Sequence, residues 1–230
     1  MDLLNINNVT RSYETSGGIK HALHHFSYTF PSTGFFGVIG KSGSGKSTLL
    51  NLISLLDKPT SGDIYFTNEN IQKWNEKRKR QYRFQDIGIV FQHYNLIESE
   101  SVIYNIALPQ LIAGKSEKKA IKHAKELLDS IEFRNNLYQQ KVRDLSGGEK
   151  ERVAILRSIA NNPRIVLADE PTGALDSKNS ELFMKMFKDI SKSKLVIMVS
   201  HNNKLIDKYA DEIITIKDGA IIKQKAKTLR

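Results

Sequence analysis

Short apolar runs recur along the chain and predict buried strands. Four of them lie at residues 35–39, 87–91, 165–168 and 195–199, and each is followed directly by a polar residue or a glycine. Between these runs, apolar residues return every three or four positions, as at Leu49, Leu52 and Leu56, which predicts amphipathic helices. Strands that alternate with helices favour an α/β fold with a largely parallel sheet.

The two ends of the chain carry strand patterns of a different kind. Alternating apolar positions near the amino terminus and at residues 23–30 predict two antiparallel strands at the edge of a mixed sheet, joined across a turn at 16–18. Tyr13 is expected in the link between them. Residues 212–217 and 220–225 predict a hairpin around Asp218-Gly219.

The middle of the chain reads differently, because residues 101–135 contain no β-rich run and follow a helical spacing. Pro109 is expected to break or start a helix there. We interpret this part as an insertion and not a separate domain. The chain is therefore predicted to form one domain over residues 1–230, with a core at 1–95 and 160–230 and a helical subdomain at about 96–159.

Composition adds a preference for anionic neighbours. Lys and Arg number 35 against 25 acidic residues, giving a net charge of +10, which suits a nucleotide, a nucleic acid or the inner leaflet of a membrane. A basic stretch at 73–83 surrounds Trp74 and Tyr82. Aromatic residues among basic ones can indicate nucleic-acid contact, but a solvated helix face is the favoured interpretation.

Several classes of protein are disfavoured by what the chain lacks. It has no cysteine, which excludes disulfides and thiolate metal sites. The amino-terminal residues do not form a basic segment followed by an apolar one, so a signal peptide is not expected. No apolar window approaches the roughly 20 residues that span a bilayer. We expect a soluble protein that acts at a membrane only through another polypeptide.

One motif indicates phosphate binding. Residues 40–47 fit the spacing G-x-x-x-x-G-K-[ST] between an apolar strand and a helix expected to begin near Ser47. Glycines allow backbone N–H groups to converge on phosphate oxygens at the positive end of a helix. Lys46 is expected to reach the β- and γ-phosphates, and the Ser47 hydroxyl to ligate Mg²⁺. The predicted nucleotide-binding residues of this loop are Gly40, Lys41, Ser42, Gly43, Ser44, Gly45, Lys46, Ser47 and Thr48.

Polar residues follow three further strands, where ligands of α/β sheets collect. Asp169 closes an apolar strand and needs a compensating cation, for which a Mg²⁺ shared with Ser47 is the natural choice. Our hypothesis is that Glu170 polarises the attacking water, that Gln92 contacts Mg²⁺ or that water, and that His201 contacts the γ-phosphate. One pocket is expected to collect Gly40 with these strand-end residues.

Six motifs in this order and spacing resemble the nucleotide-binding domain of ATP-binding cassette (ABC) proteins over essentially the whole chain. They are the phosphate loop, Gln92, residues 145–149, Asp169-Glu170, residues 173–176 and His201. Residues 91–96, 105–109 and 169–177 look like the MacB/LolD/FtsE branch. The resemblance implies a P-loop NTPase (RecA-like) fold with a mixed sheet, an antiparallel β-subdomain and an inserted α-helical subdomain. It also implies an ATPase that uses ATP and Mg²⁺, with Tyr13 either stacked on adenine or an ordinary half-exposed tyrosine.

The resemblance further implies a head-to-tail homodimer. The backbone and side chains of one copy would cover the γ-phosphate held by Lys46 of the other, through Ser146, Gly147, Gly148 and Glu149. Asp176 would lie across the dimer axis. Residues 94–105 would receive a short helix from a separate transmembrane permease, which places the chain at the cytoplasmic face of the membrane.

Within this family, export of antimicrobial peptides, bacteriocins or drugs, or resistance to them, is the favoured role. The alternative is a non-transport ATPase that signals through a membrane partner to cell-wall or division machinery, and no nucleic-acid partner is expected. One departure from the family pattern is Glu149, where many relatives have Gln. This extra carboxylate is expected to weaken ATP binding modestly, with Lys150 and Arg152 as compensating charges.

Overall fold

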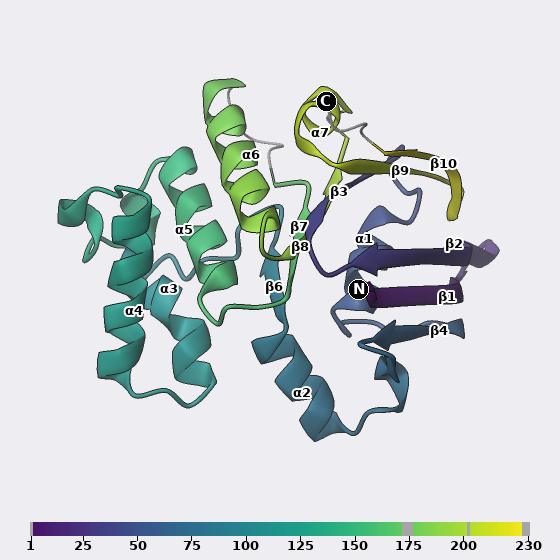
Figure 1. The fold of residues 1–230 in the computed structure, drawn as a ribbon, viewed down its shortest axis with the longest axis horizontal. Helices are drawn as coiled ribbons and strands as arrows, with labels where there is room; N and C mark the ends of the chain where they lie inside the picture. Colours follow the sequence, from purple (N-terminus) through teal and green to yellow (C-terminus); the bar gives the residue numbers. More distant parts are fainter. Residues whose placement is uncertain (1, 172–176, 202, 227–230) are drawn as a thin grey trace.

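Two β-sheets with helices around them form the molecule, a computed structural model that describes residues 2–171, 177–201 and 203–226 (Figure 1). The larger sheet has the strand order β10-β9-β3-β8-β7-β6, and all neighbours are parallel except β9 and β10. Its strands are β3 (Gly34–Ile39), β6 (Ile87–Val90), β7 (Ile165–Asp169), β8 (Leu195–Ser200), β9 (Glu212–Lys217) and β10 (Ala220–Ala226).

The central strands are buried on both faces because their alternate residues serve two different cores. In β8, Leu195 and Ile197 face a core that includes α1 (Lys46–Ile53) and α2 (Glu76–Gln85). Val196 and Met198 face the opposite core, which contains residues of α5 (Gly147–Ile159), α6 (Ser177–Ser191) and α7 (Asn203–Tyr209). A continuous apolar run is what a parallel strand covered on both sides requires.

A third core holds the helical part together. It contains residues of α3 (Val102–Ile112), α4 (Glu117–Ser130) and α5, with the 3₁₀ turns Asn135–Leu137 and Val142–Asp144 beside them. Pro109 lies inside α3, so the prediction that it breaks or starts a helix is wrong. The helix continues because Ile106 and Ala107 before the proline and Leu111 after it all pack in this core, and Ala113 N–H donates to Pro109 C=O at 3.1 Å.

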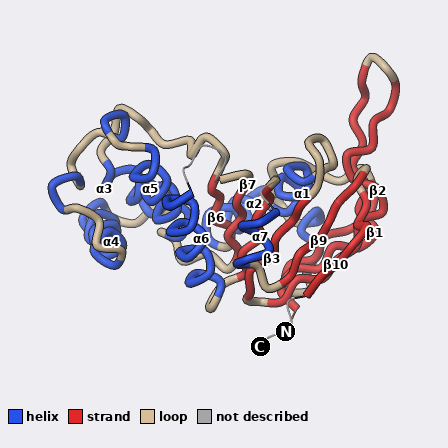
Figure 2. The backbone as a smooth tube through the Cα atoms, turned by 90° about the horizontal axis from the view of Figure 1, so that it is seen from above, coloured by secondary structure: helices blue, strands red, loops and turns tan. Residues whose placement is uncertain are grey.

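The amino-terminal strands form a sheet of their own, in the order β2-β1-β4-β5, instead of an edge of the main sheet. The strands are β1 (Asp2–Thr15), β2 (Gly18–Pro31), β4 (Ser61–Phe66) and β5 (Glu69–Asn70), followed by the 3₁₀ turn Ile71–Lys73. Figure 2 shows the tip of the β1–β2 hairpin projecting from the body of the molecule. Pairing continues to Thr15 opposite Gly18, so Tyr13 lies within β1 and not in a link.

The aromatic residues of the basic stretch pack inward. Tyr82 of α2 is buried and its hydroxyl donates to Ile53 C=O at 3.0 Å, while Trp74 lies against the Tyr82 ring and beneath the Arg78 guanidinium. These rings are therefore engaged inside the protein, which fits a solvated basic helix face better than base stacking. Among the described helices, none combines the length and the apolar character that crossing a bilayer requires.

Candidate active site

The loop between β3 and α1 has a shape that only glycine permits at two of its positions. Gly45 has φ +104°, and a Cβ there would lie 2.0 Å from Ala22 C=O. A Cβ on Gly40 would lie 2.3 Å from Ile216 C=O. Helix α1 begins at Lys46, one residue before the expected start. The loop thus presents the first N–H groups of α1 at the carboxyl end of β3, where an anion is stabilised.

Lys46 is the buried cation of this loop. Its side chain is 5% exposed, and Nζ donates to the carbonyl groups of Gly40 at 3.0 Å and Lys41 at 3.1 Å. Glu170 Oε1 lies 3.9 Å from the same Nζ. Because the two hydrogen-bonded carbonyl groups are neutral and the carboxylate lies beyond hydrogen-bond distance, the arrangement suits a polyanionic ligand such as a phosphate chain.

Asp169 and Ser47 form a set of hard oxygen donors beside Lys46. Ser47 Oγ donates to Asp169 Oδ1 at 3.0 Å across the end of β7. Burial raises the pKa of Asp169 above its ordinary value, and the Ser47 hydrogen bond and the Lys46 charge do not cancel that effect. A desolvated carboxylate next to a hydroxyl fits Mg²⁺, which prefers oxygen ligands. Gln92 lines the same hollow and adds an amide oxygen.

Glu170 is held from three sides. Its backbone has φ +45° and its N–H donates to Val199 C=O at 2.9 Å. Its Oε2 accepts a 2.6 Å hydrogen bond from His201 Nδ1, and its Oε1 faces Lys46. His201 is 64% exposed and contacts Glu170, and its contact with a γ-phosphate stays a prediction. The His201 ring therefore orients the carboxylate.

The structure divides the expected site residues between two hollows instead of one pocket. The first, called the Lys46 hollow, has a volume of about 460 Å³. Its lining consists of Tyr13, Lys20, Ala22, Ser42, Gly43, Gly45, Lys46, Ser47, Thr48, Gln92, Asp169 and Glu170. The second, called the His201 hollow, has about 630 Å³ and includes Gly40, Lys41, Ser42, Gly43, Ser44 and His201. The loop is the wall between them, because Ser42 and Gly43 line both.

Two residues of the Lys46 hollow were missed by the sequence interpretation. Lys20 and Ala22 come from β2, on the other side of the hairpin from Tyr13. Lys20 is the cross-strand partner of Tyr13 in the β1–β2 register. A register count from the turn at 16–18 places Lys20 beside Tyr13, but the apolar alternation by itself predicts two shorter strands that end before these residues.

Ser146 and Glu149 begin α5 and line neither hollow. The Glu149 carboxylate accepts hydrogen bonds from Ser146 N–H at 2.8 Å and Ser146 Oγ at 2.7 Å, and it pairs with Arg134. Burial would raise the pKa of Glu149, but the hydrogen bonds from Ser146 and the Arg134 charge hold it below its ordinary value. The charge expected to disturb a ligand is thus engaged within its own chain.

Arg134 compensates the Glu149 charge in place of the expected Lys150 and Arg152. Lys150 pairs with Glu98 at 3.0 Å, and the Arg152 guanidinium lies 5.5 Å from the Phe133 ring centroid. Gly147 and Gly148 follow Ser146 in the first turn of α5. Asp176, expected across a dimer axis, lies outside the described residues.

Comparison with known proteins places the chain among relatives of one kind. The family model described as ABC transporter matches residues 23–173. The uncharacterized ABC transporter ATP-binding protein MJ0796 of Methanocaldococcus jannaschii is 37% identical over 228 residues, which cover 97% of each chain. Methionine import ATP-binding protein MetN 2 of Acinetobacter baylyi is 35% identical over 96% of this chain and 64% of its own length.

Solved structures agree with the sequence relatives. A dimeric post-hydrolysis state of the cassette MJ0796 bound to ADP and Pi matches with a TM-score of 0.88 at 36% identity, covering 97% of this chain and 98% of the other. CbiO1 from Clostridium perfringens, part of the ABC transporter complex cbiONQ, matches with a TM-score of 0.85 at 29% identity, covering 98% and 89%.

Proposed function

Because the chain belongs to the ABC transporter family of ATP-binding proteins, we propose that it is the ATP-hydrolysing subunit that drives a separate membrane permease. The family binds and hydrolyses ATP with Mg²⁺. The observation that carries the proposal is the convergence of the buried Lys46, the Ser47–Asp169 oxygen pair and the His201-bound Glu170 around one loop. The whole chain acts in this proposal as one ATP-binding domain.

Each side chain has a distinct task in hydrolysis. Lys46 and the loop N–H groups bind the phosphate chain, and Tyr13, which lines the same hollow from β1, meets the nucleobase. Ser47, Asp169 and Gln92 would hold Mg²⁺, which neutralises charge on the phosphate oxygens when bound. Glu170 accepts a proton from the attacking water at its carboxylate, and the His201 N–H fixes the direction of that carboxylate.

A second copy of this chain completes the site in our proposal. Ser146, Gly147 and Gly148 begin α5 away from the Lys46 hollow of their own chain, so they are placed to serve another. Helix α5 presents free N–H groups at this end, and a γ-phosphate is a suitable anion for them. The relative MJ0796 forms a dimer in a structure bound to ADP and Pi, which supports pairing of two copies.

The permease is proposed to dock beside Tyr94 and Asn95. A hollow of about 280 Å³ lies there, with Phe91, Leu108 and Pro109 among its apolar lining and Arg83 and Arg157 as its cations. Arg157 donates to the carbonyl groups of Tyr94 and, at 2.6 Å, Asn95. A short helix inserted from a membrane subunit at the cytoplasmic face would therefore move a segment that directly follows Gln92.

Export of antimicrobial peptides, bacteriocins or drugs, or resistance to them, is the transport role that we propose. It is supported by the likeness of residues 91–96, 105–109 and 169–177 to the MacB/LolD/FtsE branch. The relative MetN 2 is named for methionine import, so direction has to be measured. In vesicles that contain the co-purified permease, ATP-driven movement of cargo away from the side of this chain supports export, and ATP hydrolysis without movement supports signalling instead.

The catalytic assignment is tested by Glu170→Gln. We expect ATP binding to persist while hydrolysis falls about 10²- to 10⁴-fold, because the general base is lost and the phosphate cradle is not. Phosphate release and nucleotide binding are measured on the same preparation. Glu126→Gln on the exposed face of α4 is the matched control, and its activity stays at the wild-type level. Unchanged hydrolysis in Glu170→Gln contradicts the assigned role.

A further inference from the structure

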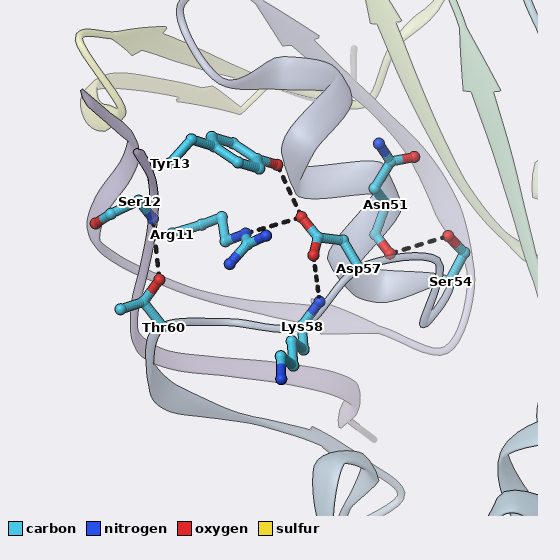
Figure 3. A network of polar contacts seen from close by, with 8 residues as sticks. All are labelled: Arg11, Ser12, Tyr13, Asn51, Ser54, Asp57, Lys58 and Thr60. Atoms are coloured by element: carbon cyan, nitrogen blue, oxygen red, sulfur yellow. Dashed lines mark hydrogen bonds and ion pairs between the residues drawn. The ribbon is translucent and has the colours of Figure 1, made fainter. Parts of the chain in front are cut away.

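The loop after α1 reaches across to the strand that carries Tyr13 (Figure 3). Asp57 Oδ2 accepts hydrogen bonds from Tyr13 Oη at 2.7 Å and from Arg11 Nε at 2.8 Å. Asp57 Oδ1 accepts a third, from Lys58 N–H at 2.7 Å. A carboxylate that accepts three hydrogen bonds, one of them from a guanidinium, is held in place and restrains the side chains that donate to it.

Arg11 fixes the Tyr13 ring in a second way. The guanidinium carbon lies 4.4 Å from the ring centroid, a cation–π distance. Arg11 and Tyr13 are two residues apart in β1, so their side chains leave the same face of the strand. Tyr13 lines the Lys46 hollow and Arg11 does not. The guanidinium therefore covers part of the ring while the residue still borders the hollow.

The position of Asp57 links Tyr13 to the phosphate loop. Helix α1 starts at Lys46 of that loop, and its last residue is Ile53. Asp57 follows four residues later and accepts the hydrogen bond of Tyr13, which lines the same hollow as Lys46. One short helix, about 12 Å long at 1.5 Å per residue, therefore joins the two groups.

We propose that Asp57 is a positioning residue that fixes Tyr13, together with Arg11, as the stacking platform for the purine base of ATP. This inference rests on the proposed function, because it assumes that the Lys46 hollow holds a nucleotide. A tyrosine at a half-exposed position on a projecting hairpin samples several side-chain orientations when it is free. Restraining it before the ligand arrives removes an ordering penalty from the binding step.

The test compares two ligands that share a phosphate chain. ATP has a base, and inorganic tripolyphosphate has none, so only ATP reports on the platform. Binding of each with Mg²⁺ is measured by calorimetry on the full chain in the Glu170→Gln background, where hydrolysis does not consume the ligand. We expect Asp57→Ala to weaken ATP binding about 3- to 10-fold and to leave tripolyphosphate binding within about twofold of the parent.

Two further variants separate positioning from a general structural role. Tyr13→Phe keeps the ring and removes the hydrogen bond to Asp57, so it should weaken ATP selectively, and in combination with Asp57→Ala it should add less than its separate effect. The matched control is Asp129→Ala, which removes a 2.6 Å tyrosine–aspartate hydrogen bond to Tyr138 in the helical part. Neither ligand should respond to that change. Circular dichroism measures whether each variant is folded. If Asp57→Ala does not fold, the effect of Tyr13→Phe on ATP binding tests the inference instead.

The outcomes are distinct. Equal weakening of ATP and tripolyphosphate by Asp57→Ala assigns Asp57 to the shape of the phosphate loop and overturns the inference. Unchanged ATP binding in both Asp57→Ala and Tyr13→Phe also overturns it, while the proposed function stands. A parent chain that binds neither ligand contradicts the proposed function itself.

Discussion

Asp169 shows how a single residue trades stability for activity. Its side chain sits at the end of β7 with the Ser47 hydroxyl at 3.0 Å, and burial raises the pKa of its carboxyl. The folded protein therefore holds this proton more tightly than the unfolded chain does. It follows that the contribution of Asp169 to folding stability increases as the pH falls, and that the ionised carboxylate destabilises the metal-free protein at neutral pH.

We therefore expect Asp169→Asn to stabilise the protein while it abolishes hydrolysis. Removing the desolvated charge should raise the unfolding midpoint of the nucleotide-free protein by about 1–3 °C at pH 7, because about 1 kcal/mol shifts the midpoint of a chain of this size by about 2–4 °C. Differential scanning fluorimetry measures the midpoint, and phosphate release measures activity. The gain should shrink in acid, where the carboxyl of the parent is protonated. A lower midpoint at pH 7 contradicts the argument.

His201 offers a second prediction at this scale. Its Nδ1 holds Glu170, and it lines the His201 hollow and not the Lys46 hollow. We expect His201→Ala to lower kcat about 10²-fold with little change in KM for ATP, because the base loses its orientation while the phosphate cradle is retained. His123→Ala on α4 is the control. A rise in KM of similar size would instead favour direct contact between His201 and the γ-phosphate.

At the scale of elements, the start of α5 is the clearest departure from expectation. Glu149 accepts two hydrogen bonds from Ser146 and pairs with Arg134, so it secures a helix end. We expect Glu149→Gln to lower the unfolding midpoint by about 2–4 °C, because the ion pair is lost and the cap is weakened. ATP affinity should stay within about twofold, since Arg134 already neutralises this charge. A tighter ATP complex would restore the original expectation that the carboxylate opposes binding.

The elements themselves were predictable to different degrees. The strands β3, β6, β7 and β8 were found from sequence because both of their faces are buried, which leaves an uninterrupted apolar run. The α/β fold with its antiparallel sheet and helical insertion is confirmed by the structure and by its match to MJ0796. The length of β1 was not predicted, since residues 11–15 are polar and half-exposed or exposed. Helix α7 is only seven residues long, too short for a clear periodicity.

The site shows the same division. The phosphate loop, Asp169 and Glu170 could be predicted as site residues, because their spacing and their position after apolar runs are visible in the local sequence. The partners of those residues do not, because His201 and Glu170 are 31 residues apart and Arg134 and Glu149 meet only through the folding of the helical part. Asp57 belongs to none of the motifs recognised in the sequence. Its hydrogen bond to Tyr13 spans 44 residues and depends on where α1 ends.

For the whole molecule, our proposal requires a second copy, because Ser146 does not line the Lys46 hollow of its own chain. Ser146 is exposed at the start of α5, so an arginine there meets no packing clash, and the loss of the hydroxyl that caps the helix with Glu149 costs about 1 kcal/mol. We expect Ser146→Arg to retain ATP binding by the single chain and to lose hydrolysis and ATP-induced pairing, because the residue meets the nucleotide of a second copy. Light scattering after size exclusion, in the Glu170→Gln background with ATP and Mg²⁺, measures pairing. A variant that still pairs and turns over contradicts the head-to-tail arrangement.

Helix α1 connects Lys46 to the segment that contains Asp57, the hydrogen-bond partner of Tyr13. This connection has a consequence for the step of the hydrolysis cycle that follows phosphate release. ADP keeps the base and the two phosphates nearest to it. In our proposal it therefore keeps its contacts with Tyr13 and with Lys46 after the γ-phosphate has left. What disappears is the contact on the side of Glu170 and of the opposing copy. The two copies should therefore dissociate while each still binds ADP, and ADP release should follow as a separate step.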